Sequence, residues 1–304
     1  MTHIRIATRQ SKLALWQSNH VADQLKRAHP GLTTELVPLS TKGDEILDRS
    51  LAEIGGKGLF LKELEIALLD SRADIAVHSL KDVPAQNPDG LALSVVLPRA
   101  NWVDWWLTRD GRRPERMPAG STVGTSSLRR QAQLLRCWPH LEIVPIRGNV
   151  QTRLGKLISG QVDAVILAAA GLERLELRAE HHQPLVPPEF LPAPGQGVIV
   201  VQCRTDDADV IETLAPLECP ATRDQVRAER AVVAELGGDC RMPLAAHATL
   251  NGDRLTIRAR LCSPDGQMCL EADASGRRTN AEAMGREVAT DLLNKDAQAI
   301  LEML

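Results

Sequence analysis

The sequence predicts an α/β protein with two lobes built on mostly parallel sheets, followed by a C-terminal α+β domain with a small antiparallel sheet. Over the first two thirds of the chain, short apolar strands alternate with amphipathic helices, and this alternation begins again near Val123. The last third instead shows strands separated by short turns, as in a meander. A chain of 304 residues is long enough for two or three such domains.

The first lobe is predicted from the alternation of strands and helices at the start of the chain. Ile4 and Ile6 alternate with polar residues as in a strand, and Ser11 is a suitable cap for the helix that follows. The remaining elements are a strand at 35–39, a helix through 60–68 and a buried strand at 74–78. This order is typical of a parallel sheet covered by helices.

The second lobe repeats that order. Its predicted elements are a strand at Val123, a helix from Ser127, a strand at 141–146, a helix at 149–158 and a buried strand at 162–168. Five prolines then mark a connecting segment, after which an apolar strand at 198–202 is expected to return to the first lobe. We therefore assign residues 1–98 with 198–215 to the first lobe and residues 103–191 to the second.

The C-terminal domain is assigned to residues 220–304. A helix at 223–236 precedes strands at 245–250, 255–261 and 267–272, and a helix at 281–293 ends the pattern. The turns between the strands carry Asn251-Gly252 and Pro264-Asp265-Gly266, which are common turn residues. These signals indicate an antiparallel sheet.

Composition and charge exclude several classes of protein. The net charge of −3 gives no overall positive field for nucleic acid or an anionic membrane. The N-terminal residues lack the apolar core of a signal peptide, and the longest apolar stretch, Val162 to Leu172, is far too short to span a bilayer. The six cysteines include no Cys-x-x-Cys pair, so we expect a cytoplasmic protein with free thiols and no metal.

An anion site is predicted at the segment Gly124-Thr-Ser-Ser-Leu-Arg-Arg130. Small hydroxyl residues at the start of a helix leave backbone N–H groups available, and two arginines in the first turn add positive charge. Such a segment is suited to bind carboxylate or phosphate. The alternative is an ordinary Ser127 cap with solvated arginines.

A second segment, Arg147-Gly-Asn-Val-Gln-Thr-Arg153, repeats this arrangement after the next predicted strand, and Asn149 is able to cap the helix that follows. Ligands of open α/β sheets gather at the carboxyl ends of strands, and Arg9 and Lys81 occupy equivalent positions in the first lobe. Arg174 lies in the helix after the strand at 162–168. A chain of negative net charge with this many cations at strand ends is expected to bind a polyanion.

Three further segments carry candidate chemistry. Asp82 is the best candidate for a catalytic carboxylate, because Pro84 favours an extended turn for Lys81 and Asp82 just past a buried strand; the alternative is a surface ion pair. The glycine loop 55–60 lacks the spacing of a phosphate loop and is expected to cover a cleft, with Phe60 at its hinge or in the core. Cys240 follows a glycine-rich helix stop, where an accessible thiol can act as a nucleophile.

Taken together, these segments resemble the hydroxymethylbilane synthase (porphobilinogen deaminase) family. The matching stretches are Ile6-Ala-Thr-Arg-Gln-Ser11 with Leu13-Ala-Leu-Trp-Gln17, Thr41-Lys-Gly-Asp44, Gly55-Gly-Lys-Gly-Leu-Phe60 with Lys62-Glu-Leu-Glu65, Ala73-Asp-Ile-Ala-Val-His-Ser79 with Lys81-Asp-Val-Pro84, Val123-Gly-Thr-Ser-Ser-Leu-Arg-Arg130, Arg147-Gly-Asn-Val150 with Thr152-Arg-Leu154, and Leu191-Pro-Ala-Pro-Gly-Gln-Gly197. They follow one another in order over nearly the whole chain.

The resemblance implies a cytoplasmic, monomeric transferase of porphyrin and heme biosynthesis, with two periplasmic-binding-protein-like lobes and a third domain. It implies that four porphobilinogen molecules are joined, with loss of ammonia, into the linear tetrapyrrole hydroxymethylbilane on a covalent dipyrromethane cofactor. Asp82 would be catalytic. The residues implied to hold the cofactor are Cys240, Lys81, Asp82, Thr125, Ser126, Ser127, Arg129, Arg130, Arg147 and Gly148, and those implied to bind substrate are Arg9, Ser11, Phe60, Ser79, Arg147, Arg153, Arg174 and Gln196.

Two other functions stay open from the sequence. The lobes alone would also suit a two-lobed anion-binding protein, although the third domain with Cys240 disfavours it. A degenerate relative without activity is the other alternative, because Asp239 stands where the family has glycine beside the cysteine. A negative charge there opposes thiolate formation, so slow attachment of the cofactor is expected.

Overall fold

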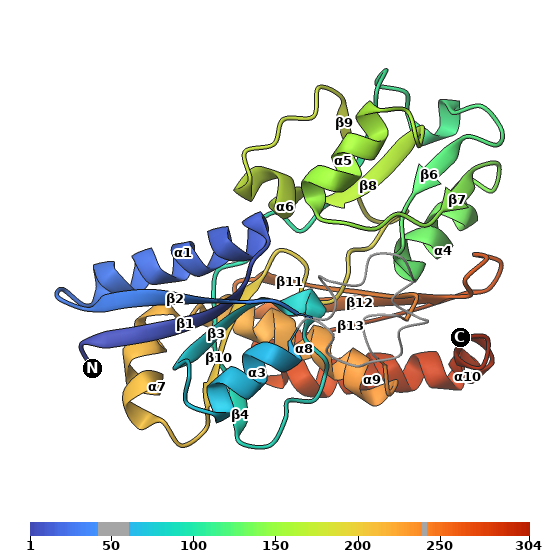
Figure 1. Ribbon diagram of the computed structural model, residues 1–304. Helices are drawn as coiled ribbons and strands as arrows, with labels where there is room; N and C mark the ends of the chain where they lie inside the picture. The colour runs from blue at the N-terminus through green and yellow to red at the C-terminus, as the bar shows by residue number, and fades with distance from the viewer. Residues whose placement is uncertain (42–60, 239–241) are drawn as a thin grey trace. The chain divides into compact units, whose positions relative to one another are not determined.

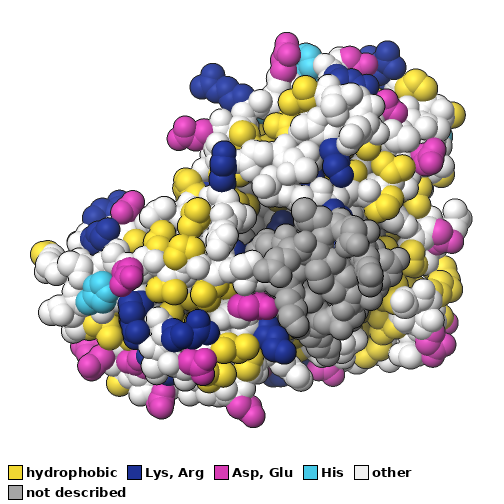
Figure 2. All heavy atoms as spheres, in the orientation of Figure 1, with side chains coloured by type: hydrophobic (Ala, Val, Ile, Leu, Met, Phe, Trp, Pro, Cys, Tyr) yellow, Lys and Arg dark blue, Asp and Glu magenta, His cyan; other side chains and the backbone are white. Residues whose placement is uncertain are grey.

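The computed structural model describes residues 1–41, 61–238 and 242–304. The chain forms two compact units, one made of residues 1–100 and 198–223 and the other of residues 101–197 and 224–304. Among the described helices, none is long and apolar enough to cross a membrane. Acidic and basic side chains are interspersed over the face shown in Figure 2, as the small net charge would suggest.

The first unit is built on a five-stranded sheet of order β2-β1-β3-β10-β4. Its strands are β1 (His3–Arg9), β2 (Thr33–Leu39), β3 (Ile75–Ser79), β4 (Leu91–Val96) and β10 (Ile199–Arg204). Its helices are α1 (Lys12–Ala28), α3 (Lys62–Leu69), α7 (Ala208–Leu214) and the short turns η1 (Leu80–Asp82) and η3 (Ala215–Leu217). The predicted return of the apolar strand near residue 200 to this lobe is confirmed, because β10 lies between β3 and β4.

Helices cover both faces of this sheet (Figure 1), and alternate residues of β1 point to opposite faces. Ile4 and Ile6 point into one core, which they share with Val21 of α1 and Leu214 of α7. Ala7 points to the opposite face and packs with α3. Because both faces are covered, the central strands are mostly apolar, and Val200 in β10 is fully buried.

The second unit contains a five-stranded sheet of order β7-β6-β8-β5-β9. Its strands are β5 (Asp104–Thr108), β6 (Thr122–Gly124), β7 (Glu142–Val144), β8 (Ala164–Ala168) and β9 (His182–Leu185), and its helices are η2 (Pro114–Arg116), α4 (Leu128–Cys137), α5 (Val150–Ile158) and α6 (Ala169–Arg174). One face of the sheet packs against α4 and the other against α5 and α6.

The same unit carries a three-stranded antiparallel sheet in the last third of the chain. It consists of β11 (Leu244–Asn251), β12 (Arg254–Cys262) and β13 (Cys269–Arg277). Four helical elements accompany it: α8 (Pro220–Glu235), whose residues 220–223 belong to the first unit, η4 (Arg278–Asn280), α9 (Ala281–Asn294) and α10 (Ala297–Leu301). Val232 of α8 and Val288 of α9 pack with Ile257 of β12 in its core. The predicted meander with flanking helices is confirmed.

The predicted fold class is confirmed, with one correction to the sheets. Each five-stranded sheet is mixed rather than mostly parallel, with two parallel and two antiparallel pairings. In the first sheet the antiparallel pairs arise because β10 runs opposite to both of its neighbours, β3 and β4. A strand that arrives from a distant part of the chain is not bound to the direction that a crossover helix imposes on its neighbours.

Two of the three tryptophans between residues 102 and 106 lie in strand β5. Trp106 is buried in the core beneath α4 and its Nε1 donates to Arg112 O at 2.9 Å, whereas Trp105 packs on the opposite face. Successive residues of a strand face opposite sides, so both indoles find an apolar environment. The pairings of β5 with β8 and β9 then fix this segment inside the sheet.

Candidate functional site

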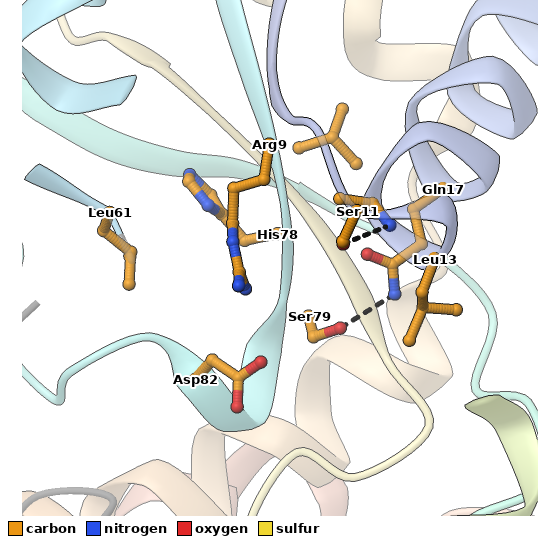
Figure 3. A pocket seen from close by; sticks show the side chains of 10 residues that line it. Arg9, Ser11, Leu13, Gln17, Leu61, His78, Ser79 and Asp82 are labelled. Carbon is orange, nitrogen blue, oxygen red and sulfur yellow. Dashed lines mark hydrogen bonds between the residues drawn. The ribbon is translucent and has the colours of Figure 1, made fainter. Parts of the chain in front are cut away.

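A pocket in the first unit lies where β1 and β3 end. Arg9 closes β1 and Ser79 closes β3, so the two side chains leave the sheet at the same edge. The pocket is lined by Arg9, Ser11, Leu13, Ala14, Gln17, Leu61, Val77, His78, Ser79 and Asp82. Figure 3 shows the Arg9 guanidinium and the Asp82 carboxylate both directed into it. The sequence-predicted residues Arg9, Ser11, Ser79 and Asp82 are thus brought together.

The polar wall of this pocket is held by the start of α1. Ser11 is the N-cap of the helix, as predicted, and its Oγ accepts a hydrogen bond from Ala14 N at 3.3 Å. Two turns further on, the buried Gln17 donates from Nε2 to Ser79 Oγ at 2.8 Å. This bond fixes the Ser79 hydroxyl beside the pocket (Figure 3).

His78 lies in the wall of the pocket but is held as a neutral core residue. Its Nε2 lies 3.0 Å from Gln202 Oε1, and because an amide oxygen only accepts, Nε2 is the donor. Burial, together with the nearby Arg9 charge, lowers the pKa of His78 to about 4. An imidazole with this pKa is uncharged at neutral pH. Asp82 is the acidic side chain among the described residues that line the pocket.

Asp82 lies on a single helical turn rather than on the extended turn predicted for it. Leu80, Lys81 and Asp82 form η1, which closes when Val83 N donates to Leu80 O at 3.0 Å. The proline at position 84 restricts only the residue before it, and Val83 is indeed extended. The tight turn directs the half-buried Asp82 into the pocket, and Lys81, also half-buried, is the residue before it.

In the second unit, the predicted anion segment forms the start of α4. Ser127 is the N-cap, with its Oγ accepting from Arg130 N at 3.4 Å, and Thr125 Oγ1 accepts from Ser127 N at 3.2 Å. Ser126 Oγ donates to Ile146 O at 2.7 Å and so ties the segment to the next strand connection. Gly124 allows a close approach to Ile146, since a Cβ at this position would come within 2.8 Å of Ile146 Cδ1.

Arg129 and Arg130 are buried in the second unit rather than solvated, and both bind Asp104. Arg129 Nη2 donates to Asp104 Oδ2 at 2.7 Å, and Arg130 Nη2 donates to Asp104 Oδ1 at 2.6 Å. The side chains are 5%, 7% and 0% exposed, in the order Arg129, Arg130 and Asp104. Burial lowers the pKa of Arg129, an effect that the Asp104 charge opposes. The solvated-arginine alternative is therefore wrong.

Gln196 joins the same cluster. Its Nε2 donates to Asp104 Oδ1 at 3.1 Å and to Trp102 O at 2.6 Å. Arg129 Nη1 donates to Leu191 O at 2.7 Å, a second bond to the segment that contains Gln196. Asp104 thus organises three of the predicted site residues, although no sequence signal marked it.

Three further predicted residues lie in or beside the turn between β7 and α5. Asn149 caps α5 by accepting from Thr152 N at 2.9 Å, which confirms the predicted cap. Gly148 has φ +107°, a conformation that favours glycine, and Arg153 Nε donates to its carbonyl at 2.9 Å. Arg147 is half-buried and directly precedes this turn.

Arg174 lies at the end of α6. Its Nη2 donates to Gly197 O at 2.9 Å, and burial lowers its pKa to about 10. A guanidinium with this pKa is still charged at neutral pH. Of the described residues, no group of three or more histidines, cysteines, aspartates or glutamates could hold a metal ion.

Two predicted site residues, Phe60 and Cys240, lie outside the described residues. The glycine loop 55–60 and Asp239 also lie outside them. Both flanks of Cys240 are described. α8 ends at Glu235 and Gly237 follows with φ +64°, which confirms the predicted glycine helix stop. Beyond the gap, Met242 precedes β11 and lies so close to Gly238 that a Cβ there would clash with its Sδ.

The residues present fit a ligand that carries several carboxylates. At the start of α4, two guanidinium groups share one carboxylate, so this cluster keeps a net positive charge. Arg130 Nε is buried and has no hydrogen-bond partner among the described groups. A buried donor without a partner is costly, and an anionic ligand at this helix start would relieve that cost.

Comparison with known proteins agrees with this chemistry. The family model described as porphobilinogen deaminase, dipyromethane cofactor binding domain, matches residues 4–212, and the model of the C-terminal domain of the same family matches residues 224–294. The porphobilinogen deaminase of Chromobacterium violaceum is 50% identical over 301 residues, which cover 99% of this chain and 97% of that protein.

Similar solved structures include the periplasmic VFT2 domain of Bordetella pertussis BvgS, with 16% identity, a TM-score of 0.44 and coverage of 70% of this chain and 85% of that one. Another is YhfZ from Shigella flexneri, with 20% identity, a TM-score of 0.37 and coverage of 72% and 91%. Both parts of the chain match the models of one family, and half of its residues are identical to those of a full-length relative. The chain therefore belongs to the porphobilinogen deaminase family.

Proposed function

We propose that this protein catalyses the reaction after which its family is named. In this reaction, porphobilinogen units lose ammonia and are joined into the linear tetrapyrrole hydroxymethylbilane. The single observation that carries the proposal is the pocket of the first unit, in which Asp82, Arg9 and Ser11 meet at the ends of β1 and β3. A carboxylate next to a guanidinium suits a substrate that is anionic at its side chains and becomes cationic at its pyrrole.

Asp82 is the proposed catalytic residue. Loss of ammonia from porphobilinogen requires a proton on the leaving amine and leaves positive charge spread over the pyrrole ring. Asp82 is placed to transfer that proton and then, as a carboxylate, to stabilise the cation by charge and by accepting a hydrogen bond from the ring N–H. Because the neighbouring His78 is neutral, it carries no positive charge that would offset this negative charge.

The arginines are proposed to bind and orient the acetate and propionate side chains of the pyrroles. In the first unit Arg9 takes this role, with the hydroxyls of Ser11 and Ser79. In the second unit the role falls to Arg129, Arg130, Arg147, Arg153 and Arg174, together with Gln196 and the start of α4. Planar guanidinium forks hold carboxylates in fixed orientation better than lysine does.

The dipyrromethane, when bound through the thiol of Cys240, supplies the terminal pyrrole carbon that is extended. Lys81, Asp82, Thr125, Ser126, Ser127, Arg129, Arg130, Arg147 and Gly148 are proposed to hold it. Phe60 is proposed as a substrate contact. On the described flanks of Cys240, a glycine helix stop precedes the cysteine and strand β11 follows it.

We also propose a cytoplasmic monomer with porphobilinogen as its small-molecule partner. The proposed domain limits are 1–98 with 198–215, 103–191 and 220–304, which agree with the presence of three separate sheets. The five cysteines that the structure describes are free thiols, which suits a reducing compartment.

The variant Asp82→Asn tests the assignment of the catalytic carboxylate. The amide keeps the shape and loses the charge, so turnover is expected to fall by about a hundredfold or more, while the melting temperature and porphobilinogen binding stay near the wild-type values. Asp273→Asn, at an exposed position of β13, is the matched control and is expected to keep full activity. Turnover of Asp82→Asn near the wild-type rate would make Asp82 a structural residue.

A different measurement separates the enzyme from the two alternatives, an anion-binding protein or a degenerate relative. The purified protein is treated with an aldehyde reagent for pyrroles, and its intact mass and peptides are compared with the sequence. A colour reaction and an added dipyrromethane on Cys240 are expected. An unmodified mass after prolonged incubation with porphobilinogen would show that the chain has the fold without the activity.

A further inference from the structure

Two cysteines, 22 and 29 residues after Cys240 in the sequence, face each other across the last hairpin of the chain. Cys262 ends β12 and Cys269 opens β13, and the two residues are direct partners in the antiparallel register. Their Sγ atoms are 2.8 Å apart, with Cys262 as the donor of a hydrogen bond to Cys269. The proposed function uses neither thiol.

The backbone bonds show that these cysteines form a non-hydrogen-bonded pair. Cys262 N donates to Pro243 O on the opposite side of β12, and the bond from Ser263 N to Met268 O, at 2.8 Å, closes the neighbouring pair. In such pairs the Cα atoms are about 4.5 Å apart and the side chains lie closer than in hydrogen-bonded pairs. That separation is within the range of about 4.4–6.8 Å that a disulfide accepts.

The turn that joins the two strands is held in place, so the thiols stay opposed. Met268 N donates to Ser263 Oγ at 2.9 Å, and Gly266 has φ +73° at the tip. A Cβ on Gly266 would lie 2.6 Å from Ala132 O in α4, which shows how closely the turn packs on that helix. The opposed thiols therefore belong to a fixed hairpin.

The two thiols have different environments. Cys262 is fully buried and Cys269 is half-buried, so a small oxidant reaches Cys269 first. The hydrogen bond from Cys262 and the charges of Arg136 and Arg260 lower the pKa of Cys269 against the opposing effect of burial. The same hydrogen bond, together with burial, raises the pKa of Cys262. Cys269 is thus the nucleophile of the pair and Cys262 its neutral partner.

We propose that Cys262 and Cys269 form a reversible disulfide when the protein meets a hydroperoxide. The Cys269 thiolate attacks a peroxide oxygen, so an S–O bond forms, the O–O bond breaks and hydroxide or alkoxide leaves. The Cys262 thiol then attacks the sulfenic sulfur of Cys269. The S–S bond forms, the S–O bond breaks, and the thiol proton leaves with the hydroxyl group as water. An external dithiol then reduces the disulfide back to two thiols by exchange and is itself oxidised to a disulfide.

Cys137 is the thiol that could compete. It ends α4, its charge interacts with that of Cys269, and burial raises its pKa. Its Sγ donates to Glu189 O at 3.8 Å, whereas Cys262 already bonds to Cys269. The expected disulfide therefore joins Cys262 to Cys269 and leaves Cys137 reduced. Cys137→Ser is accordingly the matched control.

The tryptic cleavage sites in the sequence allow a direct test. Trypsin releases residues 261–277 as one peptide that contains both Cys262 and Cys269, whereas Cys137 begins a different peptide. The full-length purified protein is treated with hydrogen peroxide, free thiols are alkylated, and the digest is analysed by mass spectrometry. We expect the peptide of residues 261–277 to lose two hydrogen atoms, to resist alkylation, and to regain both thiols with dithiothreitol.

Two serine variants test the order of the steps. Cys262→Ser is expected to trap a sulfenic acid on Cys269 that dimedone labels, whereas Cys269→Ser is expected to leave Cys262 unlabelled. Cys137→Ser should form the disulfide as the wild type does. An unchanged peptide in the wild type, a cross-link between the two peptides through Cys137, or dimedone labelling of Cys262 in Cys269→Ser would each overturn the proposal. The wild-type result decides the matter even where a variant does not fold.

Discussion

Replacing Asp104 with asparagine should destabilise the second unit more than any single change at an exposed ion pair. The Asp104 side chain is 0% exposed and accepts hydrogen bonds from Arg129 at 2.7 Å, Arg130 at 2.6 Å and Gln196 at 3.1 Å. The amide keeps the shape but leaves two buried guanidinium charges without their counter-charge. The polar groups left behind, rather than the lost contacts alone, set the size of the effect.

Removing one partner of a buried ion pair costs about 3–5 kcal/mol of the free energy of unfolding. For a unit of this size, each kcal/mol lowers the melting temperature by about 2–4 °C, so a decrease of roughly 10 °C is expected. Differential scanning calorimetry of the wild type and the variant at neutral pH measures it. Circular dichroism at low temperature checks that the variant is folded before heating.

The control is Glu282→Gln, which removes the same charge from an exposed pair. Glu282 and Arg286 are four residues apart on α9, 2.8 Å from each other and each about half exposed. Such helix pairs contribute about 0.3–0.5 kcal/mol. If Asp104→Asn lowered the melting temperature no more than Glu282→Gln, the buried cluster would not be the electrostatic centre of this unit and the reasoning would fail.

Two other predictions concern stability. The pKa of His78 is about 4 in the folded protein and 6.5 when unperturbed, so between pH 6.5 and 4 the unfolded chain takes up a proton that the folded protein does not. Urea unfolding should therefore show that the free energy of unfolding falls by about 3 kcal/mol between pH 6.5 and pH 4. The variant His78→Gln should lack this part of the decrease. Gly285→Ala should lower the free energy of unfolding by about 1–3 kcal/mol, because its Cβ would meet Ala228 O and Ala231 Cβ where α9 packs on α8. The matched change Gly155→Ala, with nothing within 4 Å in helix α5, should instead stabilise by about 0.5–1 kcal/mol, and equal effects from the two glycine variants would contradict this packing.

Local signals in the sequence predicted the elements that place the site. The caps Ser11, Ser127 and Asn149 were identified correctly, because a cap depends only on the residues within one helical turn of it. The alternation along β1, the apolar run of β8 and the turn residues of the last hairpins also predicted these elements correctly. The predicted strands also placed Arg9 and Asp82 at strand ends, and the structure brings both side chains to one pocket.

The parts that failed depend on which distant segments pair. Strand β5 was not predicted, because its two adjacent indoles gain meaning only once a sheet provides two apolar faces. The direction of β10 likewise follows from its pairing with β3 and β4, which lie more than a hundred residues earlier in the chain. Local periodicity carries no information on either point.

The sequence by itself thus determined the α/β class, the positions of the helix caps and the kinds of side chain available to a polyanionic ligand. Only the tertiary structure decided that Arg129 and Arg130 share Asp104 in a buried cluster, and that Cys262 faces Cys269. The physical reason is the same in both cases. Burial and cross-strand register arise from contacts between segments that are brought together by the whole fold, and they set charge, pKa and reactivity after the residue types are fixed.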